Sequence, residues 1–169
     1  MANTYTLIQS VEVGSGGAAS IEFAGIPQTY TDLLLMVSGR ATTDNPTLYV
    51  YLNGDTTAGN YSFRLVGGDG ASASSSTASQ AWFMRVAPSS ATASTFSNGC
   101  MYVQNYTDST SNQIVSVDSV TENNGTTAYT ALHAGLWSST AAITSILLDP
   151  YGTDFAQYSS ASLYGIKNS

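Results

Sequence analysis

The feature that most constrains the fold of this chain is a two-residue alternation of apolar and polar positions that recurs along most of its length. The stretch LYVYLNGDTTAGNYSFRLV, residues 48–66, shows it twice, with a patch of Asn, Gly, Asp and Thr between the two runs. Side chains of a β-strand point alternately to its two faces, and such polar patches are typical of turns. The stretch is therefore predicted to be a β-hairpin with a long turn.

Eleven segments show this strand pattern, and no segment shows a convincing helical period. The predicted strands are Thr4–Val13, Ile21–Phe23, Leu33–Arg40, Leu48–Leu52, Tyr61–Val66, Trp82–Val86, Cys100–Tyr106, Ile114–Val120, Tyr129–Trp137, Ile143–Leu148 and Ser162–Ile166. Short strands separated by Gly, Asn, Asp and Ser turns are typical of antiparallel sandwiches. We expect an all-β chain that forms an antiparallel, jelly-roll-like β-sandwich, as a single domain over residues 1–169.

Two segments rich in small polar residues interrupt the strands. They are GGDGASASSSTASQ, residues 67–80, and APSSATASTFSNG, residues 87–99. Neither carries enough apolar surface to bury itself, so both are predicted to be mobile surface loops. They are interpreted either as flexible connectors without a role or as loops that touch a partner.

Charge is scarce and mostly negative. The net charge is -7, because 11 acidic residues face only Arg40, Arg64, Arg85 and Lys167. Nucleic-acid binding through phosphates needs clusters of Lys and Arg, so DNA and RNA are not expected partners. The sole cysteine, Cys100, excludes an intrachain disulfide and is predicted to be a small buried side chain.

The sequence gives no sign of membrane targeting. Its start, MANTYTLIQS, lacks the basic and apolar regions of a signal peptide, and apolar runs such as LLLMV at 33–37 are too short to span a bilayer. We expect a protein made in a cytoplasm, with no membrane association. If it acts outside a cell, release with a virus particle at lysis is one route.

Candidate catalytic residues are few. His133 is the only histidine, and it shares its strand parity with Tyr129 and Trp137, which favours a hydrogen-bonded residue on a packed face over a base or ligand. Asp149 and Asp154 could serve as a glycosidase pair, but they flank a Pro-Tyr-Gly turn that accounts for both. We therefore expect no enzymatic activity and no cofactor.

Calcium is the one metal for which candidate ligands exist. Asn53, Asp55 and Asp69 offer the oxygen atoms that calcium binds, from segments predicted to be loops. Their spacing does not match an EF-hand, and Asn-Gly-Asp is first of all a turn signal. We therefore interpret them as turn residues and assign no metal site.

Aromatic residues give the sharper functional alternatives. Tyr49 and Tyr51 alternate with aliphatic residues, which places them on a second, half-exposed face of their strand. Tyr and Trp beside Asn and Asp suit sugar-binding faces and protein interfaces, although Tyr is also simply a common strand residue. The candidate sugar-stacking rings are Trp82, Tyr102, Tyr106 and Trp137, of which we expect Trp82 and Trp137 to belong to the core.

Three stretches carry a resemblance to a known family. They are SGGAASIEFAGIPQTYTDLLLMVSGR (15–40), LNGDTTAGNYSFRLVGGDG (52–70) and YSSASLYGIKNS (158–169). With them, the chain resembles small β-rich virion structural proteins of tailed phages, over nearly its whole length. The resemblance implies a non-enzymatic protein of the capsid decoration or tail-appendage type, displayed on the outer surface of the particle and made in the host cytoplasm. It implies no catalytic residues.

Of these two roles, we expect capsid decoration first. A tail fibre or appendage that binds a host-surface glycan is the alternative, but the chain shows neither heptads nor a separate attachment module. The expected partners are the major capsid protein or other virion proteins, together with further copies of the chain in a closed homo-oligomer, with a trimer favoured. The candidate interface residues are Tyr49, Tyr51, Tyr158 and Tyr164.

Overall fold

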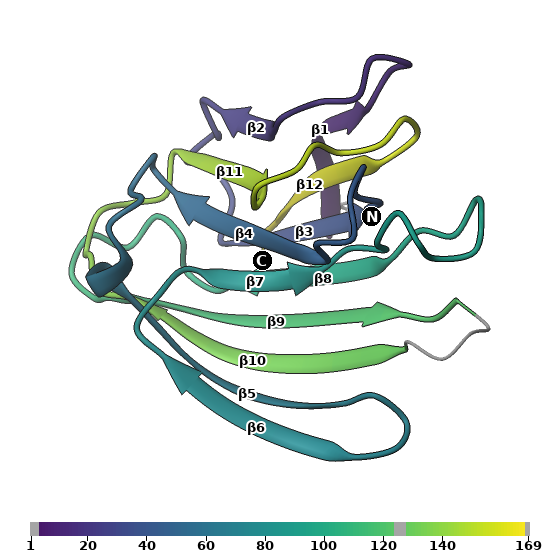
Figure 1. Ribbon diagram of the computed structural model, residues 1–169. Helices are drawn as coiled ribbons and strands as arrows, with labels where there is room; N and C mark the ends of the chain where they lie inside the picture. The colour runs from purple at the N-terminus through teal and green to yellow at the C-terminus, as the bar shows by residue number, and fades with distance from the viewer. Residues whose placement is uncertain (1–3, 124–127, 168–169) are drawn as a thin grey trace.

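Figure 1 shows the computed structural model of the chain, which describes residues 4–123 and 128–167. The larger of its two sheets contains, in spatial order, β1 (Tyr5–Glu12), β12 (Ser160–Ile166), β3 (Asp32–Ser38), β8 (Asn98–Val103), β9 (Gln113–Thr121), β10 (Tyr129–Trp137), β5 (Tyr61–Gly68) and β6 (Ala73–Ala78). The smaller sheet contains β2 (Ile21–Ala24), β11 (Ser145–Pro150), β4 (Thr47–Leu52) and β7 (Trp82–Arg85). One short 3₁₀ turn, Ala58–Asn60, precedes β5.

The predicted all-β, antiparallel sandwich is confirmed. Neighbouring strands in both sheets run antiparallel, and the chain passes repeatedly from one sheet to the other, as in a jelly roll. Figure 1 shows the smaller sheet lying across one face of the larger sheet. The opposite face of the larger sheet therefore lacks a second layer in the described part of the chain.

The alternation that predicted the strands also explains the core. In β9, Val115 and Val117 are buried between the sheets, whereas Ile114 and Ser116 point to the opposite face and are exposed. A similar alternation, of buried and half-buried positions, runs through β4 and β12. Burial of one face of each strand thus drives the two sheets together.

An aromatic group closes one end of the core. The ring of Tyr61 lies 5.2 Å from that of Trp82 and 6.4 Å from that of Trp137, measured between centroids. The Trp82 ring lies against Gly135 of β10, where a Cβ atom would overlap the indole. Gly135 therefore permits the close approach of β7 to the larger sheet.

The prediction of a mobile loop over residues 67–80 is wrong in its central part. Residues 61–68 and 73–78 form a β-hairpin whose register runs without interruption from Phe63 opposite Ala78 to Gly68 opposite Ala73. Strand β6 consists of small residues that are mostly exposed, and it extends past the smaller sheet (Figure 1). Main-chain hydrogen bonds to β5, which leave no apolar pattern in the sequence, hold this strand.

The second predicted loop, residues 87–99, contains no strand before β8 begins at Asn98. The guanidinium of Arg40 fixes it by donating hydrogen bonds of 2.9–3.0 Å to four main-chain carbonyls, those of Ser89, Ala91, Thr92 and Thr95. Four carbonyl groups directed at one cation are a strong constraint. This loop is therefore tied to the sandwich at its centre.

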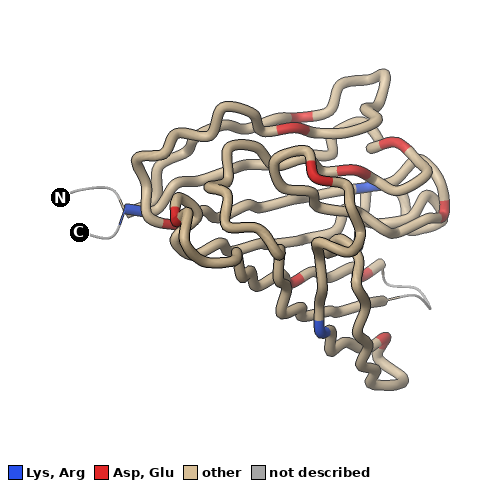
Figure 2. Tube along the Cα trace, turned by 90° about the vertical axis from the view of Figure 1, so that its left-hand side faces the viewer, with Lys and Arg blue, Asp and Glu red and all other residues tan. Residues whose placement is uncertain are grey.

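Charged side chains are sparse over the whole molecule. Figure 2 shows the few basic and acidic residues dispersed along the trace. Among the described residues, no helix has the length and apolar character needed to cross a membrane.

Candidate binding face

The main surface feature lies on the larger sheet, on the side turned away from the smaller sheet, which we call the outer face. Ten large apolar side chains are exposed in the described residues, and all except Tyr151 and Tyr158 lie on the outer face. They are Tyr5, Leu7, Met36, Val66, Tyr102, Ile114, Val120 and Leu132. Exposed apolar side chains gathered on one face mark an interaction surface.

Strand register shows that these side chains form one surface. Leu132 of β10 lies opposite Val66 of β5 and, on its other side, opposite Asp118 of β9. Residues directly opposite in an antiparallel pair project to the same face. Ile114 is 67% exposed and Leu132 is 53% exposed, so neither contributes to the core.

A hollow of about 710 Å³ lies within the outer face. Apolar side chains including Val66, Ile114 and Leu132 line it, together with the ring of Tyr102. The segment 104–112, between β8 and β9, contributes the amides of Gln104, Asn105 and Asn112 to its lining. Arg64 and Asp108 also line it, so the hollow combines an apolar surface with polar side chains that include one charge of each sign.

Asp32 organises one wall of this hollow. It is only 1% exposed, and its two carboxylate oxygens accept hydrogen bonds from the Tyr102 hydroxyl at 2.6 Å and from the Asn105 amide at 2.9 Å. The bond to Asp32 raises the pKa of Tyr102 to about 12. Asn105 has φ 50°, a left-handed conformation that asparagine tolerates. A buried carboxylate thus positions both an exposed ring and the loop beside it.

The wall is tied down further by hydrogen bonds within the loop. The carboxylate of Asp108 accepts hydrogen bonds from the amide and hydroxyl of Thr110 at 2.8 and 2.7 Å, and these bonds lower the pKa of Asp108. The side-chain amide of Gln113 donates to the Asp108 carbonyl at 3.1 Å. These bonds give the loop a fixed conformation around the hollow.

The four predicted interface tyrosines do not form one surface. Tyr49 and Tyr51 lie on the outward side of the smaller sheet, where the Tyr49 ring contacts that of Tyr151 at 5.2 Å. Tyr164 lies on the outer face of the larger sheet, opposite Leu34. Tyr158 is exposed in the turn before β12, with φ 70°. The prediction therefore combined residues from opposite sides of the sandwich.

Three of the four candidate sugar-stacking rings belong to the core. Trp82 and Trp137 are buried as expected, and their indole nitrogens donate to the Ser62 carbonyl and to the Asp55 carboxylate. Tyr106 is also buried, and its hydroxyl donates to the Pro27 carbonyl. Of these four rings, Tyr102 alone is exposed, by 36%.

His133 lies on the buried side of β10, as its strand parity predicted. Its ring contacts Phe63 edge-on at 5.4 Å between centroids. Burial lowers the pKa of His133 to about 4, despite an opposing hydrogen bond with the main chain of Val117. The ring therefore stays neutral near pH 7.

The two acidic residues considered as a glycosidase pair have different environments. The prediction that Asp149 is a turn residue is wrong. It belongs to β11 and lies opposite Tyr49. Asp154 follows the turn, and its main chain exchanges hydrogen bonds with Thr42. Strand β11 continues through Pro150, so Asp149 lies within the sheet and not in the turn.

The three candidate calcium ligands do not gather at one site, because Asn53 and Asp55 precede β5 and Asp69 follows it. The Asn53 side-chain oxygen accepts from the amides of Thr144 and Ser145, and Asp55 binds Trp137. Asp69 caps the turn at the opposite end of β5. Within residues 4–123 and 128–167, no group of three or more His, Cys, Asp or Glu side chains is arranged to hold a metal.

Cys100 is half-buried rather than buried, because it occupies an outward position of β8 beside Met36 and Asp118. Burial raises the pKa of its thiol.

Sequence reasoning also missed the outer face itself. Its one signal was that Val66 directly follows Leu65 and Ile114 directly precedes Val115, so that an apolar residue falls on each face of these strands.

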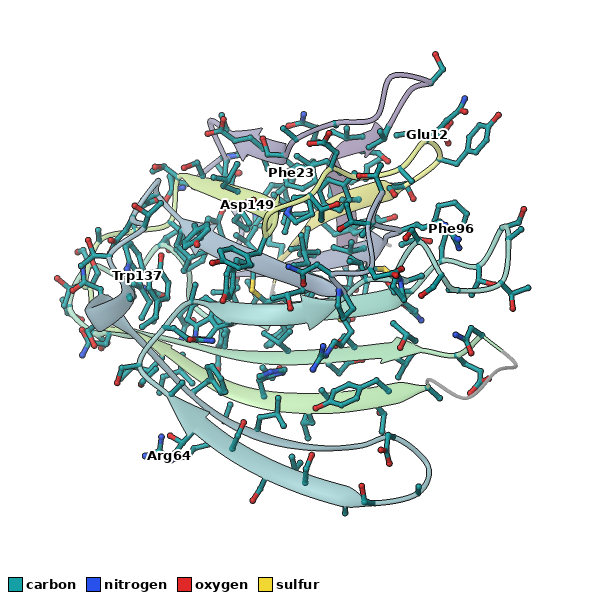
Figure 3. All side chains as sticks on the ribbon, in the orientation of Figure 1. Glu12, Phe23, Arg64, Phe96, Trp137 and Asp149 are labelled. Carbon is teal, nitrogen blue, oxygen red and sulfur yellow. The ribbon has the colours of Figure 1, made fainter. Side chains whose placement is uncertain are left out.

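Figure 3 places the charged Arg64 of β5 near the edge formed by β5 and β6, and Arg64 lines the hollow together with Val66 and Leu132. From β3 across to β5, the outward strand positions carry three charged residues, the buried Asp32 and the exposed Arg64 and Asp118. The face is thus nearly neutral on a chain of net charge -7.

The comparisons with known proteins found no matching family model, curated protein or solved structure.

Proposed function

We propose that this chain is a non-enzymatic structural protein of a phage particle, a capsid decoration protein that docks on the head through the outer face. The observation that carries the proposal is that eight of the ten large apolar side chains exposed in the described part of the chain gather on that face. Protein interfaces combine an apolar centre with depletion of charge, and this face has both. The resemblance to virion structural proteins of tailed phages is the reason for assigning the protein to a phage particle.

The proposal places the chain on the outer surface of the particle, after synthesis in the host cytoplasm. The neutral face suits contact with the major capsid protein or another virion protein, because apolar burial there does not require the removal of water from many charges. The fixed sandwich behind the face suits a protein that reinforces a shell. Its loss should weaken particles against heat while host adsorption continues.

The experiment compares two charge insertions. Ile114→Asp together with Leu132→Asp places two carboxylates in the centre of the outer face, while Tyr151→Asp together with Thr56→Asp adds the same charge elsewhere on the surface. We expect the first variant to fold but to lose binding to heads that lack the protein, and the second to bind normally. Equal binding by both variants would refute docking through the outer face.

A second candidate function is the binding of a neutral saccharide in the hollow, as part of a tail appendage. The observation that favours it is the Tyr102 ring, held by Asp32 at the edge of a hollow lined by amides. Such a ring can stack on a sugar while amides bond its hydroxyls. A glycan array would test it: saturable binding that disappears in Tyr102→Ala but persists in Tyr151→Ala would support this function over head decoration.

A further inference from the structure

The eight-stranded sheet ends in an unusual edge strand. In the described chain, β6 pairs with β5 on one side and has no strand on the other. Its sequence, ASSSTA, contains neither a charge nor a proline, and its register with β5 has no bulge. An edge of this kind presents unpaired main-chain N–H and C=O groups in a regular row.

The other three sheet edges all carry features that discourage pairing. Strand β1 ends in Glu12, and its register is interrupted between Leu7 and Gln9. Strand β2 is four residues long and contains Glu22, and β7 is equally short and contains Arg85. Charges, bulges and short length are the usual protections of edge strands. Only β6 lacks all of them.

The composition of β6 also favours a copy of itself as the partner. Its small, uncharged side chains allow close approach on both faces, and the smaller sheet does not cover it. The whole hairpin from Tyr61 to Ala78 carries one cation, Arg64, and one anion, Asp69, so it is neutral on a chain of net charge -7. Two copies that meet here avoid the repulsion that would oppose contact elsewhere.

We propose that two copies of this chain join through antiparallel pairing of β6 with β6, which makes one continuous sheet across a two-fold axis. In the register that pairs all six residues, Ser75 of one copy lies opposite Ser76 of the other. The contact is self-complementary, so it gives a dimer as the basic unit instead of the trimer favoured by the sequence. The inference goes beyond the proposed docking function and does not depend on it.

The first test uses charge. Ser75→Lys together with Ser76→Lys places like charges directly opposite each other in the paired edge, whereas Thr140→Lys with Ala141→Lys adds the same two charges to an exposed loop. Light scattering of the native chain and of the loop variant should give a dimer, with twice the single-chain mass of 17.6 kDa. The β6 variant should give the mass of a monomer. A monomeric native chain, or a dimer that survives in the β6 variant, would overturn the proposal.

The second test traps the same register. In a Cys100→Ser background, Ser75→Cys together with Ser76→Cys should form a disulfide-linked dimer under mild oxidation, because opposite residues lie close to bonding distance. Thr140→Cys in the same background should not do so. Failure of the β6 cysteines to crosslink would reject this pairing. Head binding by the Ile114 and Leu132 variants reports separately on the docking function.

Discussion

The buried carboxylate of Asp32 accepts a 2.6 Å hydrogen bond from the hydroxyl of Tyr102, an exposed aromatic residue on the outer face. The bond fixes the ring of Tyr102 without burying it. The second carboxylate oxygen holds the Asn105 amide, so one residue orients the ring and the adjoining loop together. This arrangement presents a rigid surface. A rigid surface loses little conformational entropy when a partner binds, so the entropic cost of binding is lower.

The first prediction concerns this pair. Asp32→Asn should lower the pKa of Tyr102 from about 12 toward its ordinary value of 10.0, because the carboxylate bond and its negative charge disfavour the phenolate. Phenolate absorbance can be titrated with and without Asp32→Asn, and Tyr102→Phe in each background isolates the signal of this tyrosine. An unchanged pKa would show that the hydrogen bond to Asp32 does not control the ring.

His133 should make stability depend on mildly acidic pH. Its pKa is lowered from 6.5 to about 4 by burial, so between these values the unfolded chain binds a proton that the folded chain does not. The free energy of unfolding should therefore fall as pH falls from about 6.5 to about 4. Denaturant titrations of the native chain and His133→Leu should show a flatter profile in the variant. Parallel profiles would contradict the assignment.

Asp55 should act in a separate, more acidic window. Its pKa is lowered from 3.8 to about 2, chiefly by the 2.8 Å hydrogen bond from the Trp137 indole. A lowered carboxyl pKa stabilises the fold above pH 3.8, and this stabilisation is lost as pH falls toward 2. Melting temperatures of Asp55→Asn should change less over this range than those of the native chain. His133→Leu serves as the control, because it should retain the native slope here.

Arg40 should be the main support of the loop over residues 87–97. Arg40→Met leaves four carbonyl groups without their charged donor and should lower the free energy of unfolding by about 2 kcal/mol. Hydrogen exchange should become faster at Ala91, Thr95 and Ser97, whose amides bond within or next to the loop. Arg64→Met, which removes an exposed arginine, should cost less than about 0.5 kcal/mol. Similar losses in both variants would refute this role.

Gly135 should be intolerant of any side chain. Gly135→Ala pushes a methyl group into the indole of Trp82 and should cost about 1–3 kcal/mol through overpacking, as measured by denaturant unfolding. Gly14→Ala is the matched control, because a Cβ there meets no atom within 4 Å. Equal stability of the two variants would mean that β7 can shift away from β10 at little cost.

Local patterning determined much of the fold. Alternation over residues such as those of β4 and β9 was enough to predict strands, because burial of one face imposes a period of two on the sequence. Alternation could not reveal β6. Its serines are exposed and form no buried apolar face, and its pairing with β5 is what keeps it extended. A ladder of main-chain hydrogen bonds leaves no mark on side-chain composition.

The candidate site shows the same division. From the sequence, Trp82 and Trp137 could be assigned to the core, but Tyr102 was not distinguished from Tyr106, and Ile114 could not be told from a core residue. Only the packing of the smaller sheet decided which face of each strand was buried, because period-two alternation marks two faces without saying which one is covered. The sequence by itself determined a low-charge antiparallel β-sandwich. The tertiary structure decided where its apolar surface is exposed, since that depends on how far the second sheet extends over the first.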